Sequence, residues 1–137
     1  MMPGDRPVLI IDDHPDDIYL TREAILATRP SCPVEDVREG SRALARLRRE
    51  PVPALVLLDL KLPGMDGCEI LREIRSREET RYIPVVMLTS SDLHHDMKSS
   101  YGLGANGYIS KEQDMDDFIH LMDVTLHFWL EHNLVPF

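Results

Sequence analysis

Acidic residues follow two short apolar segments at the point where each segment ends. Val8–Ile11 runs directly into Asp12 and Asp13, and Leu55–Leu58 runs into Asp59. Three carboxylates brought to one place repel each other, and a bound divalent cation neutralises that repulsion. We therefore expect a Mg²⁺ site here, in which one residue of the adjacent pair binds the ion directly and the other acts through water.

Hydroxyl and ammonium groups follow two further segments and could complete a phosphoryl-transfer site. Val85–Leu88 ends in Thr89 and Ser90, and Lys111 follows a weaker apolar segment. The carboxylate of Asp59 can attack phosphorus to give an aspartyl phosphate, and it needs no general base because it is already ionised. Such a transfer depends mainly on positioning and on charge stabilisation around the phosphoryl oxygens. The cation and the lysine would supply positive charge, and the hydroxyls would supply hydrogen bonds.

The elements that position these residues alternate along the chain. Continuous apolar segments are typical of strands buried on both faces, and amphipathic segments between them are typical of helices. The expected strands are Val8–Ile11, Val34–Val37, Leu55–Leu58, Val85–Leu88 and Gly107–Ile109, and the expected helices are Asp16–Ala27, Ser41–Arg49, Gly67–Arg77, Asp92–Tyr101 and Met115–Leu130. This alternation predicts an α/β fold, a doubly wound five-stranded parallel sheet of the flavodoxin-like type with helices on both faces. Active sites of such folds lie outside the carboxyl ends of the strands.

Length and composition fit one globular domain. The 137 residues match a single domain, and we place it at residues 7–131, with tails at 1–6 and 132–137. The net charge of −9 argues against nucleic-acid binding, which recruits basic surfaces. No apolar run approaches the length of a membrane span, and the sequence begins without a basic stretch followed by an apolar one. We therefore expect a cytoplasmic protein that does not bind membranes.

Neither the cysteines nor the histidines indicate a metal site. Cys32 and Cys68 form no CxxC motif, and reduced thiols are expected for a cytoplasmic chain. The six histidines are scattered, and the adjacent His94 and His95 would point about 100° apart on a helix.

These residues, in this order and at these spacings, resemble the receiver domains of two-component response regulators. Thr89 and Lys111 follow Asp59 by 30 and 52 residues, and the loop Leu60–Gly67 is similar to the family's segment after the phosphoacceptor. The acidic pair after the first strand matches as well. The resemblance covers Pro7–Phe128, nearly the whole chain.

The resemblance implies a phosphoaccepting signalling switch with a histidine kinase as donor. It assigns Asp59 as phosphoacceptor, and Asp13, Asp59 and the backbone carbonyl of Lys61 as direct Mg²⁺ ligands, with Asp12 acting through water. Such a protein is not an enzyme on other substrates, because it catalyses only its own phosphorylation and dephosphorylation.

The resemblance also implies a switch pair and shows one departure. Tyr108 occupies the place of the aromatic residue that turns inward when Thr89 moves toward the phosphoryl group. The alternative is an aromatic residue on an edge strand that packs beside the last helices. The family usually has proline after its lysine, often with a cis peptide, but Glu112 follows Lys111 here, so a trans peptide or an unusual loop is expected. This departure, together with Phe128–Glu131, is similar to single-domain regulators paired with phytochrome-type histidine kinases.

The signal is expected to leave through protein binding, because no output domain follows in this sequence. By resemblance, the first helix docks the kinase, with Ile18, Tyr19 and Arg22 as candidates; the alternative is that they are ordinary packing residues. The expected receiver of the signal is a further, unidentified downstream protein.

The last expected helix carries two apolar stripes. The first stripe consists of Met115, Phe118, Ile119, Met122, Leu126, Trp129 and Leu130, and the second of Leu121, Val124 and Phe128. A surface helix needs only one such stripe, and exposed apolar area commonly marks an interface. We therefore expect a homodimer through Leu121, Val124, Phe128 and Trp129, unless the tail Asn133–Phe137 covers this face.

Three other functions fit less well. A phosphatase of the haloacid dehalogenase type also forms an aspartyl phosphate, but it needs a second aspartate two residues later, where this chain has Lys61. A flavodoxin-like cofactor binder would offer hydroxyls and glycines to a phosphate, whereas the acidic segment Asp12–Asp17 would repel one. A degenerate receiver that serves only for interactions usually lacks the acceptor or the acidic pair, and this chain keeps both.

Overall fold

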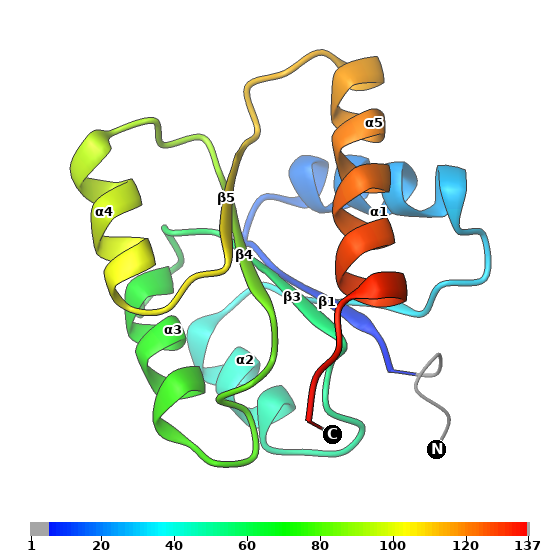
Figure 1. Cartoon of the computed structure of the whole chain (residues 1–137). Helices are drawn as coiled ribbons and strands as arrows, with labels where there is room; N and C mark the ends of the chain where they lie inside the picture. Colours follow the sequence, from blue (N-terminus) through cyan, green and yellow to red (C-terminus); the bar gives the residue numbers. More distant parts are fainter. Residues whose placement is uncertain (1–5, 137) are drawn as a thin grey trace.

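The computed structural model describes residues 6–136 and confirms the expected fold (Figure 1). Five parallel strands form one sheet in the order β2-β1-β3-β4-β5. The strands are β1 (Val8–Ile11), β2 (Val34–Val37), β3 (Leu55–Leu58), β4 (Val85–Thr89) and β5 (Gly107–Ser110). β4 and β5 are each one residue longer than expected, and the other three match their predicted bounds.

Helices cover both faces of the sheet. They are α1 (Pro15–Thr28), α2 (Gly40–Leu47), α3 (Gly67–Ser76), α4 (His94–Gly102) and α5 (Met115–Leu126), followed by a π-helical turn (His127–His132). Buried residues of α1 and α5 share one apolar cluster, and those of α2 and α3 share another. α4 lies beside α3 on the second side (Figure 1). Among the described residues, no helix combines the length and the apolar character that crossing a membrane requires.

The continuous burial of β1 and β3 explains why their sequences are apolar throughout. Val8 and Ile10 point to the cluster beneath α1 and α5, whereas Leu9 and Ile11 point to the opposite cluster. In-register parallel pairing sets Ile11 opposite Leu58. The carboxyl ends of the two strands are therefore level, and whatever follows them lies side by side.

The end of the last helix differs from the expected continuous helix Met115–Leu130. The α-helical hydrogen bonding stops at Leu126, and the π-helical turn takes over. The start of α4 also differs from the expected Asp92, because the helix begins at His94 and its N-cap residue Leu93 makes no side-chain cap. Asp66 caps α3, since its side chain accepts from the Glu69 amide at 3.0 Å. Apolar periodicity reports which face is buried, and it carries little information on how the last turn is bonded.

Both cysteines are free thiols, as expected. Cys32 packs against the cluster beneath α1 and α5, and Cys68 packs against the cluster on the other face. The sheet therefore lies between them.

Gly67 is required where the segment after the phosphoacceptor candidate turns into α3. A Cβ at this position would lie 2.2 Å from the carbonyl oxygen of Asp59 and 2.9 Å from Cα of Leu60. Both neighbours are backbone atoms, so the chain itself would have to move. We predict that Gly67→Ala lowers the free energy of unfolding by about 2 kcal/mol or more, measured by urea denaturation.

Gly102→Ala is the matched control, because a Cβ there meets nothing within 4 Å. Its free energy of unfolding should stay within about 0.5 kcal/mol of the wild type. Equal unfolding midpoints for the two variants would show that the Asp59–Gly67 contact does not constrain the fold.

Candidate functional site

A buried ion cluster lies at the carboxyl edge of the sheet. Asp12 follows β1, Asp59 follows β3 and Lys111 follows β5. The Lys111 Nζ lies 2.7 Å from Asp12 Oδ2 and 3.0 Å from Asp59 Oδ2. It also lies 3.1 Å from Asp17 Oδ2, which comes from the first turn of α1. The structure thus brings together three of the residues that the sequence selected.

Short backbone bonds hold these side chains in place. The Asp59 amide donates to the Ile11 carbonyl at 2.9 Å, and the Lys111 amide donates to the Thr89 carbonyl at 2.9 Å. Each bond extends a strand pairing by one residue beyond the apolar segment. The functional side chains are therefore fixed by the sheet itself, not by a flexible loop.

Lys111 stays protonated despite its burial. Desolvation alone would lower the pKa of Lys111, but the hydrogen bonds and charges of Asp12 and Asp59 outweigh it, so the pKa is raised above its usual value. Asp12 and Asp59 are themselves almost completely buried. Buried charges of this kind are tolerated only when they are paired and hydrogen-bonded.

One carboxylate oxygen of this cluster lacks a hydrogen bond. Asp13 Oδ1 is buried and has no hydrogen-bond partner among the described residues. His14 Nδ1 lies 3.2 Å from it, and lies 3.1 Å from Asp12 Oδ1 and 3.8 Å from Asp59 Oδ2. Ligand atoms of Asp12, Asp13, His14 and Asp59 all lie within 4.8 Å of one another. An unpaired buried carboxylate oxygen is unfavourable, and a divalent cation would satisfy it.

Sequence reasoning did not identify His14 as part of the site. Its imidazole is more than half exposed, yet its Nδ1 faces the acidic pair. The hydrogen bond to Asp12 is the largest influence on its pKa, and it raises that pKa above the usual value. The sequence feature that could have identified His14 is its position immediately after Asp13, which is the N-cap of α1 in the structure.

Thr89 and Tyr108 are connected through one residue. Thr89 is buried at the end of β4, and its Oγ1 accepts from the Ser91 amide at 3.3 Å. The hydroxyl of Tyr108 donates to the Ser91 carbonyl at 2.9 Å. Ser90 lies between Thr89 and Ser91 and is exposed to solvent. The two expected switch residues are therefore both bonded to the Ser91 backbone, Thr89 to its amide and Tyr108 to its carbonyl.

The loop after Lys111 is fixed without proline. The Lys111–Glu112 peptide is trans, as expected. The Glu112 amide donates to Ser110 Oγ at 3.0 Å, and a proline would lack that donor. Lys61 lies in the exposed loop between β3 and α3, and a metal-ligand role for its carbonyl stays a prediction.

The expected docking residues on α1 divide into three environments. Ile18 is 4% exposed and belongs to the core, so the prediction that it could contact a kinase was wrong. Arg22 is bonded to the Val34 carbonyl and to Asp36. Tyr19 is 62% exposed, and its neighbour Leu20, which the sequence argument did not select, is also exposed. Leu20 borders a hollow of about 210 Å³ that reaches Lys111 and Phe118.

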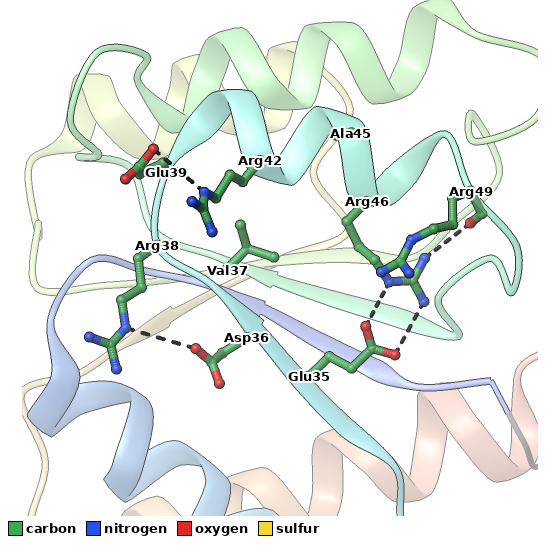
Figure 2. A pocket seen from close by; sticks show the side chains of 9 residues that line it. All are labelled: Glu35, Asp36, Val37, Arg38, Glu39, Arg42, Ala45, Arg46 and Arg49. Carbon is green, nitrogen blue, oxygen red and sulfur yellow. Dashed lines mark hydrogen bonds and ion pairs between the residues drawn. The ribbon is translucent and has the colours of Figure 1, made fainter.

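A larger hollow of about 750 Å³ lies between β2 and α2, away from the acidic site (Figure 2). Figure 2 shows Arg46 beside Glu35, with Arg46 Nε 2.7 Å from Glu35 Oε1. Arg38 and Arg42 line the other end, where they face Asp36 and Glu39 respectively. Charges of both signs pair within the wall of this hollow, and none of the residues predicted for phosphoryl chemistry lines it.

The second stripe of the last helix is only partly open. Val124 and Phe128 are each about half exposed. Leu121 and Trp129 instead pack against the apolar cluster beneath α1 and α5. Leu134 in the tail is 93% exposed, so it covers none of this face.

The raised pKa of His14 predicts a pH-dependent contribution to stability in metal-free protein. Because the folded-state pKa is raised, the contribution is fully present below the unfolded value of about 6.5 and is lost as the pH rises through the folded value. His14→Gln should therefore lower the free energy of unfolding more at about pH 5.5 than at about pH 9. Urea denaturation in the presence of a chelator measures both values.

His120→Gln is the control, because His120 is exposed on α5 and lies outside the cluster. A loss for His14→Gln that is the same at both pH values would contradict the interaction with the acidic pair.

Comparison with known proteins finds similarity to response regulators in both sequence and structure. The sequence pattern of the response regulator receiver domain matches residues 8–123. Response regulator Rcp1 of Synechocystis is 33% identical over 96% of this chain and 93% of its own length. Among solved structures, the phosphorylated cyanobacterial phytochrome response regulator RcpA superposes with a TM-score of 0.88 at 34% identity, over 96% of this chain and 99% of that one. The Mn²⁺-bound form of Rcp1 gives a TM-score of 0.85 at 33% identity over the same shares.

Proposed function

The chain belongs to the response regulator receiver family, and from this premise we propose that Asp59 accepts the phosphoryl group. The observation that carries the assignment is the buried carboxylate of Asp59, held 3.0 Å from Lys111 Nζ and beside the acidic pair. Receivers are phosphoaccepting signalling switches whose donors are histidine kinases. Asp59 is the acidic residue that follows the central strand β3, where a partner's phosphohistidine could approach from the open edge of the sheet.

The proposed transfer uses residues already in position. An Asp59 carboxylate oxygen attacks phosphorus, its new P–O bond forms as the P–N bond of phosphohistidine breaks, and the departing imidazole takes a proton from solvent. The ammonium group of Lys111 stabilises the negative charge that develops on the phosphoryl oxygens, and the hydroxyls of Thr89 and Ser90 donate hydrogen bonds to these oxygens. Attack by water on the aspartyl phosphate later releases inorganic phosphate and resets the switch.

The family and the acidic cluster support a divalent cation, and we propose that this cation is Mg²⁺. Asp13 and Asp59 would hold it directly, with the Lys61 carbonyl, and Asp12 would act through water. Asp13 Oδ1 is the buried oxygen that lacks a hydrogen bond, so it is the best suited to accept a cation. When bound, the ion would neutralise charge on the phosphoryl oxygens. A related protein, Rcp1, has been solved in an Mn²⁺-bound form.

A phytochrome-type kinase is the proposed partner. The chain is similar to proteins described as a cyanobacterial phytochrome response regulator and as a bacteriophytochrome response regulator, with 34% and 36% identity. On α1, the exposed Tyr19 remains a proposed docking residue, and the exposed Leu20 takes the place of the buried Ile18. An unidentified downstream protein would read the phosphorylated state, with Thr89, Ser91 and Tyr108 as the connected switch.

The phosphoacceptor assignment is tested by intact mass after incubation with Mg²⁺ and acetyl phosphate. We predict one phosphoryl adduct per chain for the wild type, and none for Asp59→Asn or after chelation. Asp16→Asn is the matched control, because Asp16 is exposed on the first turn of α1 and should still give the adduct. A folded wild type that never forms the adduct would instead identify an interaction module without phosphoryl chemistry.

We also propose a homodimer through the exposed apolar side chains Val124 and Phe128. Truncation before Trp129 is a poor test, because Trp129 packs against the core. Phe128→Glu is sharper, since it places a charge on the half-exposed face, and we predict that it weakens self-association at least tenfold in sedimentation velocity. Tyr82→Glu is the control, because Tyr82 is equally exposed on another part of the surface. Identical sedimentation of wild type and Phe128→Glu would place any dimer elsewhere.

A further inference from the structure

Two histidines face each other at the end of the π-helical turn. His127 Nε2 and His132 Nε2 are 2.9 Å apart, and the ring centroids are 4.4 Å apart. Both side chains are exposed to solvent. Neither residue takes part in the acidic site or in the core.

The π-helical turn is the reason that the two rings meet. Residues five apart on an α-helix point about 140° away from each other, so a continued α5 would separate this pair. In a π-helix the hydrogen bonds run between residues five apart, and such residues point much closer to the same side than they do on an α-helix. The Asn133 amide donates to the Phe128 carbonyl at 2.7 Å, which is one such bond.

A carboxylate orients the first imidazole. His127 Nδ1 lies 2.6 Å from Glu131 Oε2, and the same oxygen accepts from Arg29 NH2 at 2.7 Å. Arg29 also donates to Asp123 at 2.9 Å, so the end of α1 holds this network in place. Because Glu131 accepts the proton on Nδ1, the Nε2 of His127 is unprotonated and accepts from His132 Nε2 at 2.9 Å. A carboxylate behind a ligating histidine is the usual outer-shell partner in protein metal sites.

The two ring centroids are closer together than they would be in a linear hydrogen bond between the two nitrogens. A linear bond of this length between two imidazoles would put the ring centroids about 5.2 Å apart. Two imidazole nitrogens bound at about 2.05 Å to one ion, at right angles, would lie about 2.9 Å apart with centroids about 4.5 Å apart. A tetrahedral ion would require nitrogens about 3.3 Å apart. The observed distances of 2.9 Å and 4.4 Å agree with the right-angled arrangement.

We propose that His127 and His132 chelate one divalent transition-metal ion per chain, of the kind that prefers imidazole ligands and tetragonal geometry, such as Cu²⁺ or Ni²⁺. The ion would form a bond to each Nε2 and displace to solvent the proton that the two nitrogens share. Water would fill its remaining positions. Glu131 would act as the positioning residue, because it fixes the tautomer of His127.

This site is separate from the acidic cluster. α5 begins beside the carboxyl ends of the strands and runs back across the sheet, so its last turn lies at the opposite edge (Figure 1). A hollow there is lined by Arg29, Trp129 and Glu131 together with Pro33 and Ala54, which precede β2 and β3. An ion at the acidic cluster would therefore be remote from Trp129.

Quenching of Trp129 fluorescence tests the proposal, because this tryptophan is the only one in the sequence and lies within the same turn. Ni²⁺ or Cu²⁺ would be titrated into full-length protein in the presence of excess Mg²⁺, with calorimetry to count bound ions. We predict saturable quenching with one ion per chain at this site, weakened at least tenfold in His127→Gln and in His132→Gln. Glu131→Gln should weaken binding by about tenfold, as expected when an outer-shell carboxylate is lost.

His120→Gln is the matched control. It removes another exposed histidine of α5 and should quench like the wild type. Circular dichroism would confirm that every variant is folded. The proposal is overturned if the wild type shows neither fluorescence quenching nor a heat of binding on addition of the metal ion. It is also overturned if His132→Gln binds the ion as tightly as the wild type, or if binding saturates at one ion for two chains.

Discussion

The buried charge of Lys111 is the interaction on which the site depends. Its ammonium group can remain inside the protein only because Asp12 and Asp59 surround it at hydrogen-bonding distance. Removing one partner of a buried ion pair typically costs roughly 3–5 kcal/mol, whereas an exposed pair contributes about 1 kcal/mol or less. The ends of β1, β3 and β5 are therefore tied to one another electrostatically as well as by the sheet. Any reaction at Asp59 necessarily changes the environment of Lys111, and through it the loop that leads into α5.

The charge balance of the cluster explains why a cation fits although a lysine is already present. Lys111 neutralises only one unit of charge, while Asp12, Asp13, Asp17 and Asp59 contribute four when ionised. The imidazole of His14 adds positive charge only when it is protonated, and its hydrogen bond is to Asp12. The buried oxygen of Asp13 remains without a hydrogen-bond partner in the described part of the chain. A divalent cation would reduce the residual charge and satisfy that oxygen at the same time.

The sequence predicted the sheet and the acidic site well because both follow from one rule. Strands of a buried parallel sheet are apolar throughout, and polar residues such as Asp59 follow directly after the apolar strand, at the carboxyl edge of the sheet. Side-chain direction on helices was less predictable, since Ile18 lies in the core while the adjacent Tyr19 is exposed. The contact of His14 with Asp12 depends on a rotamer at a helix N-cap, which no periodic pattern records. The π-helical turn was missed for a similar reason, because Trp129 and Leu130 are apolar in either helix type.

The two helices on either side of β5 along the chain, α4 and α5, are anchored to the core to different extents. α5 buries Phe118, Met122 and Leu126 in the core, and its end is fastened to α1 through Arg29. α4 buries a single side chain, that of Ser100, and has no side-chain cap at Leu93. Local opening requires least free energy where few apolar side chains are buried, so α4 is easier to displace than α5. Ser91, bonded to both Thr89 and Tyr108, lies between Thr89 and α4 along the chain. A change at Asp59 would therefore meet less resistance toward α4 than along the anchored helix α5.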